Sequence, residues 1–369
     1  MDKTLLYKIG LTLLPGIGPV LARNLISWCG GVEEVFRSRK ARLEKIPGIG
    51  RKTAEQIASA NVLSRAEEEI RFIEKNHIRP LFFQDEDYPA RLKECYDSPL
   101  LLYYKGNADL NAPKTVALVG TRNATDYGKA VCEKIIEALA PLQVLVISGL
   151  AYGIDITAHK ASLSHGLKTV GVLGHGMRTI YPSVHRSVAQ KMLTQGGLLT
   201  EFLSDEKPNR ENFPTRNRII AGLADALIVV ETRKKGGAII TAEVANTYNR
   251  EVFAVPGNID APFSEGCNFL IRTNKAALLD DMSELIRSMQ WSAADTMARP
   301  ALQAELFSDL NPHEQQLVNL LKEKQPLRID ELSARLQQPS GTIASSLLAL
   351  ELKGIIKSLP GKRYQLNGC

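Results

Sequence analysis

The segment Thr115-Val116-Ala117-Leu118-Val119-Gly120-Thr121-Arg122-Asn123 decides the predicted fold, because an apolar, strand-like run ends there at a glycine and a basic turn. Similar apolar runs follow, with helix-length segments between them, at 144–147, 169–173, 198–202, 226–230 and 252–255. Because these runs are almost continuously apolar, they predict strands that are buried on both faces of a parallel sheet. The alternation predicts an α/β fold with a doubly wound, parallel, Rossmann-like sheet.

Right-handed crossovers bring every strand-to-helix loop of such a sheet to its carboxyl edge, where ligands bind. We expect six loops there, including 212–218 between the fourth and fifth strands, and four of the six carry Arg or Lys. Glycines let backbone N–H groups approach an anion, and the basic side chains add charge-assisted hydrogen bonds to phosphate. This cationic rim suits a chain of phosphates better than one mononucleotide. Its candidate DNA-binding residues are Gly120, Thr121, Arg122, Asn123, Ser148, Gly149, Gly174, Phe213, Arg216, Asn217, Arg218, Lys234, Lys235, Gly236 and Gly237.

The spacing of glycines argues against two common nucleotide-binding motifs. A Walker A loop requires GxxxxGK[ST], but Gly120 and Gly128 are too far apart, and Ala130 follows Lys129. A dinucleotide fingerprint requires GxGxxG after the first strand and an acidic residue near the end of the second. The sequence has neither, so we expect no ATP, NAD or FAD, and no other cofactor, at this edge.

Residues suited to catalysis are sparse. Asp155 and His159 stand four apart on a predicted helix. They form either a functional pair on one face or, more simply, a helix cap and a packed histidine. Glu201 and Glu231 end strands, where they either orient basic side chains or act as acids or bases. Since no Ser, Cys or carboxylate pair stands in a nucleophile setting, we expect no catalytic residues and no enzyme.

A short Pro-Gly-Ile-Gly pattern occurs twice near the amino terminus, at 15–18 and 47–50, each time before a helix-like stretch. A glycine turn followed by a helix start exposes backbone N–H groups that bind anions. The pair is similar to helix-hairpin-helix motifs, which either bind DNA phosphates or serve only as packing units. The second copy is the better binder, because Pro19 removes a donor from the first. The candidate auxiliary DNA contacts in this copy are Gly48, Gly50, Arg51 and Lys52.

The carboxyl-terminal segment predicts a winged helix. Asn311-Pro312 is a good helix start, two further helices follow, and 355–366 reads as a hairpin. The third helix, at 340–353, lacks the Arg, Asn or Gln at its start that would read bases. We therefore expect a protein-interaction or backbone-binding role, with Lys362 and Arg363 on the wing as auxiliary DNA contacts.

Size and composition predict a multidomain globular protein of 369 residues, with 44% apolar and 23% charged residues. The expected parts are a helix-hairpin-helix pair at 1–62, an extended Rossmann-like domain at 63–288, a linker at 289–307 and a winged-helix domain at 308–369. A net charge of +6 fits a polyanionic partner without requiring one. Five scattered cysteines, no metal-ligand spacing, no signal-like start and no bilayer-length apolar run predict a cytoplasmic protein without metal or membrane role.

Several blocks of sequence, in order and spacing, resemble the DprA/Smf family of bacterial DNA-processing proteins. The resemblance covers about 88–279, and its blocks are 117–122, 148–155 with His159, 174–182, 213–222, 236–241, 255–257 and 266–271. It implies binding of single-stranded DNA, protection of incoming strands and loading of the RecA recombinase during natural transformation. It also implies a homodimer formed through the Rossmann domain.

Carried over to this chain, the resemblance implies phosphate contacts at Arg122, Arg186, Arg216, Arg218 and Lys235, with backbone donors at 148–149. Because 232–235 carries more charge than the family pattern, the neighbouring Lys234 is an equal candidate. Two other functions remain. One is a nucleotide-processing enzyme of the phosphoribohydrolase type. The glycine pair 236–237, with Thr241 and Glu243, faintly resembles the Gly-Gly-x-Gly-Thr-x-x-Glu loop of those enzymes. The other is a sequence-specific regulator that would use the winged helix.

Overall fold

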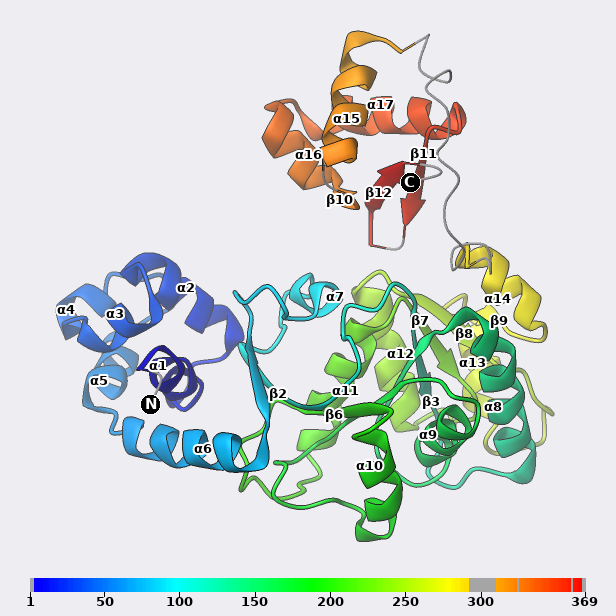
Figure 1. Ribbon diagram of the computed structural model, residues 1–369, viewed down its shortest axis with the longest axis horizontal. Coiled ribbons are helices and arrows are strands. Elements are labelled where there is room, and N and C mark those ends of the chain that lie inside the picture. The colour runs from blue at the N-terminus through cyan, green and yellow to red at the C-terminus, as the bar shows by residue number, and fades with distance from the viewer. Residues whose placement is uncertain (1–2, 292–309, 324, 360, 367–369) are drawn as a thin grey trace. The chain divides into compact units, whose positions relative to one another are not determined.

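The computed structural model describes residues 3–291, 310–323, 325–359 and 361–366. The chain divides into two compact units, residues 1–282 and 283–369 (Figure 1). Residues 292–307 of the predicted linker lie outside the described part of the chain. Among the described residues, no helix combines the length and the apolar character that a bilayer crossing requires.

The first unit begins with a small helical domain. The two Pro-Gly-Ile-Gly turns place Gly16 at φ 72° and Gly48 at φ 84°, which only glycine adopts freely. Gly18 and Gly50 then precede two of its helices, as the repeat predicts. Its helices are α1 (Lys3–Thr12), α2 (Pro19–Cys29), α3 (Val32–Arg37), α4 (Lys40–Leu43), α5 (Arg51–Ser59) and α6 (Leu63–Asn76). Their apolar faces share one core with Phe82, Leu101 and Tyr103, so the domain packs directly on the edge of the sheet.

The sheet of the first unit has nine strands in the order β1-β2-β6-β5-β4-β3-β7-β8-β9. The strands are β1 (Arg79–Phe82), β2 (Leu101–Gly106), β3 (Thr115–Val119), β4 (Leu145–Ser148), β5 (Thr169–Val172), β6 (Gly196–Thr200), β7 (Ala226–Val229), β8 (Glu251–Ala254) and β9 (Ala277–Leu278). Strands β3 to β9 are parallel, which confirms the predicted Rossmann-like core. The antiparallel β1 and β2 extend the sheet at one edge and were not predicted.

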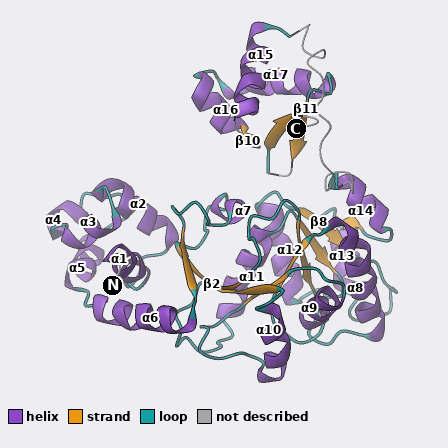
Figure 2. Cartoon of the chain, in the orientation of Figure 1, coloured by secondary structure: helices purple, strands orange, loops and turns teal. Residues whose placement is uncertain are grey.

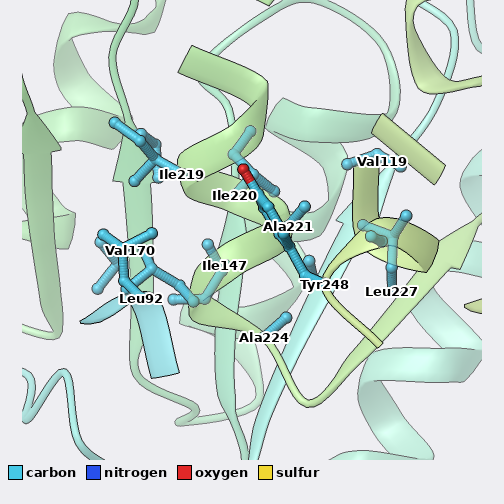
Figure 3. Packing of buried hydrophobic residues seen from close by; sticks show 14 of the residues in the cluster. Leu92, Val119, Ile147, Val170, Ile219, Ile220, Ala221, Ala224, Leu227 and Tyr248 are labelled. Carbon is cyan, nitrogen blue, oxygen red and sulfur yellow. The ribbon is translucent and has the colours of Figure 1, made fainter. Parts of the chain in front are cut away.

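Helices lie on both faces of this sheet (Figure 2). They are α7 (Ala90–Lys93), α8 (Asp126–Leu139), α9 (Ile154–Ser164), α10 (Arg186–Met192), α11 (Asn212–Leu223), α12 (Gly237–Thr247) and α13 (Glu265–Arg272). Short 3₁₀ turns, η1 (Ala140–Leu142) and η2 (Ser183–His185), precede β4 and α10. The main core joins Val119, Ile147 and Leu227 of the strands to Ile219 and Ile220 of α11 (Figure 3). This burial makes α11 the helix that connects the rim of the sheet to its centre.

One sequence expectation is wrong at this point. Residues 212–218 are not a rim loop but the first turns of α11. The physical reason is visible in the spacing of Arg216, Ile219, Ile220 and Leu223, which are all buried on one side of that helix. Two of the predicted phosphate-binding arginines are therefore carried by a helix packed against the sheet.

Helix α14 (Met282–Ser288) begins at the last residue of the first unit, and the second unit contains the predicted winged helix. The winged helix has α15 (Pro312–Glu323), β10 (Leu327–Arg328), α16 (Ile329–Leu336), α17 (Ser340–Leu352), β11 (Ile356–Leu359) and β12 (Arg363–Leu366). Asn311 caps α15, because its side-chain oxygen accepts from the Glu314 amide at 2.9 Å while Glu314 accepts from the Asn311 amide. The three strands form one antiparallel sheet in the order β10-β12-β11. Ile343, Leu347 and Leu350 bury one face of α17 in the core of this unit.

Candidate nucleic-acid interface

The loops that follow the parallel strands meet at one edge, as the doubly wound topology predicts. The amide of Thr121, after β3, donates to the carbonyl of Glu231, after β7, at 2.6 Å. The amide of Ile154, at the start of α9, donates to the Thr121 carbonyl at 3.2 Å. Tyr127 donates its hydroxyl to the Pro256 carbonyl after β8 at 2.8 Å. We call this edge the rim.

A cavity of about 90 Å³ opens on the rim at the ends of β3, β4 and β5. It is lined by Arg122, Leu150, Ala151, Tyr152, Val172, Leu173, Gly174, His175, Tyr181, Pro182, Phe213 and Arg216. The predicted residues Arg122, Gly174, Phe213 and Arg216 therefore come together here, although they belong to four separate segments of the chain. We call this the rim cavity.

Two arginines flank the ring of Phe213. The guanidinium carbon of exposed Arg122 lies 4.9 Å from the ring centre, and that of buried Arg216 lies 5.9 Å from it. A cation over an aromatic face is attracted by the ring quadrupole. Gly174 makes room for the ring, because a Cβ there would stand 3.0 Å from Phe213 Cδ1. Arg122 thus offers a positioned guanidinium to solvent beside an aromatic surface.

Arg216 forms the floor of the rim cavity. It is 4% exposed, its Nη1 donates to the Val172 carbonyl at 2.5 Å, and its Nε has no partner among the described residues. Burial lowers the pKa of Arg216, an effect that the carboxylate of Asp155 opposes. Burial likewise raises the pKa of Asp155, while Arg216 and the amide of Ala151 lower it. The guanidinium of Arg216 therefore lies at the bottom of a concave site, and the nearby Asp155 carboxylate offsets its charge only in part.

Exposed aromatic rings surround the cavity, and sequence reasoning missed them as site residues. Tyr152 and Tyr181 are each 50% exposed. Tyr181 lies 6.4 Å from Phe213 and 6.5 Å from His175, measured between ring centres. Both tyrosines stand inside the glycine-rich blocks that carry the family resemblance, and an exposed aromatic residue in such a block was the available signal.

Arg218 is not an open cation of the rim. It pairs with Glu201 and donates to the Asp97 carbonyl, and its side chain is only 14% exposed. Burial raises the pKa of Glu201, and the guanidinium of Arg218 opposes that rise. Of the two roles considered for Glu201, orienting a basic side chain matches its ion pair with Arg218.

The remaining predicted rim residues lie outside the cavity. Arg186 is exposed at the start of α10, next to His185, whose ring stacks edge-on against Tyr152 at 5.0 Å. Lys234 and Lys235 are exposed on the loop after β7, and Lys234 Nζ lies 5.2 Å from the ring centre of Phe269. The other members of the set lie at the ends of strands or in helices. They are Gly120, Thr121 and Asn123 after β3, Ser148 and Gly149 at the end of β4, Asn217 in α11, and Gly236 and Gly237 at the start of α12.

The acidic residues and the histidine considered for catalysis have structural contacts. Both ring nitrogens of His159 are engaged, Nε2 with the Gly149 carbonyl at 2.5 Å and Nδ1 with Thr169 Oγ1 at 2.7 Å. Burial lowers the pKa of His159 to about 4. Asp155 is not the cap residue of α9, since Gly153 holds that position, and its carboxylate accepts from Ala151 instead. Glu231 accepts from the hydroxyl and amide of Thr125 at the start of α8.

The auxiliary candidates lie on the surface of the two flanking domains. Gly48 and Gly50 form the second hairpin turn, and Arg51 and Lys52 are exposed in the first turn of α5. Lys362 is exposed in the wing, and Arg363 follows it as the first residue of β12. The described cysteines, Cys29, Cys95, Cys132 and Cys267, are buried free thiols.

The fold and the rim together define a multidomain Rossmann-type protein whose sheet edge is cationic and aromatic. Residues 79–290 match the family described as DNA recombination-mediator protein A, and this match spans more than half of the chain. Residues 9–60 match a SAM-like helix-hairpin-helix tandem, and residues 297–362 match the DprA winged-helix domain. The chain belongs to the DNA recombination-mediator protein A family, also called DprA/Smf.

Individual relatives agree with this assignment. Protein Smf of Synechocystis is 32% identical over 97% of this chain and 98% of its own length. The crystal structure of DNA processing protein A from Streptococcus pneumoniae superposes with a TM-score of 0.68, 30% identity, and coverage of 78% of this chain and 98% of that chain. DNA processing protein A from Helicobacter pylori, solved for its single-stranded DNA binding mode, has a TM-score of 0.53 and 28% identity, covering 58% and 95%.

Proposed function

We propose that this chain binds single-stranded DNA by its sugar-phosphate backbone along the rim, and that it acts as a recombination mediator rather than as an enzyme. The observation that carries the proposal is the exposed guanidinium of Arg122 stacked on Phe213 at the mouth of the rim cavity. A cation beside aromatic surfaces is the combination that single-strand binding uses, because arginine holds phosphate while rings stack on unpaired bases. The Helicobacter pylori relative, whose single-stranded DNA binding mode was studied, supports the same ligand here.

The rim favours recognition of the backbone over recognition of base sequence. The exposed cations occupy three separate segments, as successive phosphates require: Arg122 follows β3, Arg186 begins α10, and Lys234 and Lys235 share the loop after β7. Phosphate contacts of this kind position a strand without reading its sequence. Gly149, Gly236 and Gly237 would bring backbone N–H donors close to the same strand.

The enzyme alternative loses support from the dimensions of the site. Pockets that enclose a small-molecule substrate have volumes of roughly 300–1,000 Å³, whereas the rim cavity holds about 90 Å³. Asp155 and His159 are both buried, and His159 spends both ring nitrogens on other partners. We therefore do not assign a hydrolytic role to this pair.

The proposal is tested by gel-shift titration of full-length protein with unstructured single strands at two salt concentrations. Arg122→Ala should weaken binding about equally for every sequence and reduce the salt slope by about 0.7, the value for one single-strand phosphate contact. Lys134→Ala, an exposed lysine in the middle of α8, is the matched control and should leave both quantities unchanged. Unaltered affinity and salt slope in Arg122→Ala would refute the proposal.

The finer biological role extends this proposal to two partners. A mediator in natural transformation would protect incoming strands, load the RecA recombinase onto them and act as a homodimer through its Rossmann domain. RecA filament formation on a strand precoated with single-strand-binding protein measures the loading, and sedimentation measures the dimer. The proposed domain limits, 1–62, 63–288 and 308–369, are tested by limited proteolysis.

A further inference from the structure

The positive charge of this chain is concentrated in one short segment outside the rim. Residues 37–52 contain seven Lys or Arg and one Glu, so their net charge of +6 equals that of the whole chain. The cations are Arg37, Arg39, Lys40, Arg42, Lys45, Arg51 and Lys52. Outside this segment, basic and acidic residues balance. The net positive charge of the whole chain is thus equal to the charge of this one segment of the helical domain.

Three of these cations line a groove. Arg37, Arg39 and Arg42, with Glu34 and Ser38, surround a depression of about 280 Å³ between α3 and α4. We call it the arginine groove. Figure 1 shows α3 and α4 at the end of the helical domain that lies away from the nine-stranded sheet. The groove is therefore separate from the rim cavity.

The guanidinium groups of the groove keep donors for a ligand. Arg39 is exposed, and its guanidinium makes no hydrogen bond or ion pair to any residue within the described ranges, although its carbonyl accepts from the amides of Arg42 and Leu43. Arg37 pairs with Glu33 at 2.6 Å, but its side chain is 69% exposed, and such a surface pair contributes little stability. Because a guanidinium carries five N–H donors, both side chains can bind phosphate as they stand.

The backbone of an exposed tryptophan contacts one arginine of the groove. Arg42 Nη2 lies 3.4 Å from the carbonyl oxygen of Trp28 and 3.5 Å from that of Cys29, at the carboxyl end of α2. The charge of Arg42 complements the negative end of that helix. Trp28 itself is 56% exposed. An exposed indole is the kind of platform on which unpaired bases stack, and here it belongs to a residue whose backbone carbonyl lies next to the Arg42 guanidinium.

We propose that the arginine groove and Trp28 form a second binding surface for single-stranded nucleic acid, in which the arginines hold phosphates and Trp28 stacks on a base. This surface differs from the hairpin turns at Gly48 and Gly50, whose backbone N–H groups would serve the usual helix-hairpin-helix contact. The inference shares only the ligand class with the proposed function of the rim. One strand long enough to reach both surfaces would be held at two points.

The tryptophan provides a local readout, because Trp291, the second of the two tryptophans in the chain, is buried. Adding an oligothymidine strand to full-length protein should quench the Trp28 emission, and Trp28→Phe should abolish the quench. The quench should persist in Arg122→Ala, which weakens the rim. Persistence there would support this inference even if Arg122→Ala left the overall affinity unchanged and so refuted the function proposed for the rim.

A charge-matched pair of variants tests the arginines. The double variant Arg37→Ala/Arg39→Ala removes two exposed cations, and Arg71→Ala/Lys75→Ala removes two exposed cations from α6 of the same domain. Loss of two single-strand phosphate contacts lowers the salt slope of the Arg37→Ala/Arg39→Ala variant by about 1.4. If the variant and the unmodified protein bind equally at about 1 M salt, the variant should therefore bind roughly tenfold more weakly at about 0.15 M salt. The α6 variant should bind as the unmodified protein does.

Three results would overturn the inference. The first is a Trp28 emission that does not respond to saturating strand. The second is an equal loss of affinity in both double variants. The third is an equal or larger quench with a duplex of the same length, because paired bases are not available for stacking on Trp28.

Discussion

The guanidinium carbon of Arg122 lies 4.9 Å from the centre of the Phe213 ring, which joins the loop after β3 to the first turn of α11. This contact places a cation at the mouth of the rim cavity and restricts the conformations of its long side chain. A guanidinium that is already ordered loses less entropy when it binds phosphate. We therefore expect the pair to contribute to the proposed strand binding as a unit, so that its two members do not act independently.

A double-mutant cycle measures this dependence. Arg122→Ala and Phe213→Leu should each weaken single-strand binding, and the double variant should lose less than the sum by about 1 kcal/mol, as contacting residues do. Affinities at fixed salt give the coupling. Arg122→Ala combined with Lys235→Ala, on a different loop, is the control pair and should be additive. Additivity of the Arg122 and Phe213 effects would contradict the role assigned to the contact.

Arg218→Met should reduce stability more than DNA affinity. Its guanidinium is the partner of Glu201, and both side chains are mostly buried, at 14% and 15% exposure. Removing one member of such a pair leaves a buried charge and costs about 3 kcal/mol. Urea unfolding measures this loss, and Arg122→Met, on an exposed arginine, is the matched control. A variant that keeps full stability but binds DNA poorly would make Arg218 a direct contact.

Gly149→Ala should disturb the floor of the rim cavity. A Cβ at this position would stand 2.0 Å from Arg216 Nη1 and 2.3 Å from Asp155 Oδ2. Since both neighbours are buried, they cannot move aside freely, and overpacking of this kind costs about 1–3 kcal/mol. Thermal unfolding checks the effect. Gly237→Ala, where a Cβ meets nothing within 4 Å, should leave stability equal or slightly higher.

Acid should destabilise the first unit through His159. Burial lowers the pKa of this histidine from 6.5 to about 4, with further lowering by Arg216 and His185. Between these two values the unfolded chain binds the proton and the folded chain does not. The free energy of unfolding is therefore highest above pH 6.5 with respect to this histidine. It falls as the pH decreases toward 4, by about 3 kcal/mol in total.

Urea unfolding at several pH values tests this dependence. His159→Gln should remove most of the pH dependence between 6.5 and 4, because glutamine does not titrate. His77→Gln, at an exposed histidine in the same unit, should leave the dependence unchanged. The explanation fails if His159→Gln keeps the full slope.

Much of the fold could be predicted because its signals are local. Apolar runs such as 115–119 follow from short-range pattern, and all six predicted strands are present as β3 to β8. The order of loops on the rim then follows from the handedness of the crossovers. The glycine turn of the second Pro-Gly-Ile-Gly repeat and the Asn311 cap could likewise be predicted, because turns and caps depend on a few neighbouring residues.

What the sequence determined by itself was therefore the type of sheet, the edge at which its loops meet and the two flanking domains. Only the tertiary structure decided which of the arginines faces solvent: Arg122 is exposed, while Arg216 and Arg218 are enclosed by residues distant in the chain. It also placed the backbone carbonyl of Trp28 next to the Arg42 guanidinium, and the antiparallel β1 and β2 at the edge of the sheet. The physical reason is that burial and pairing of a charge depend on its neighbours in space, which short-range sequence patterns do not encode.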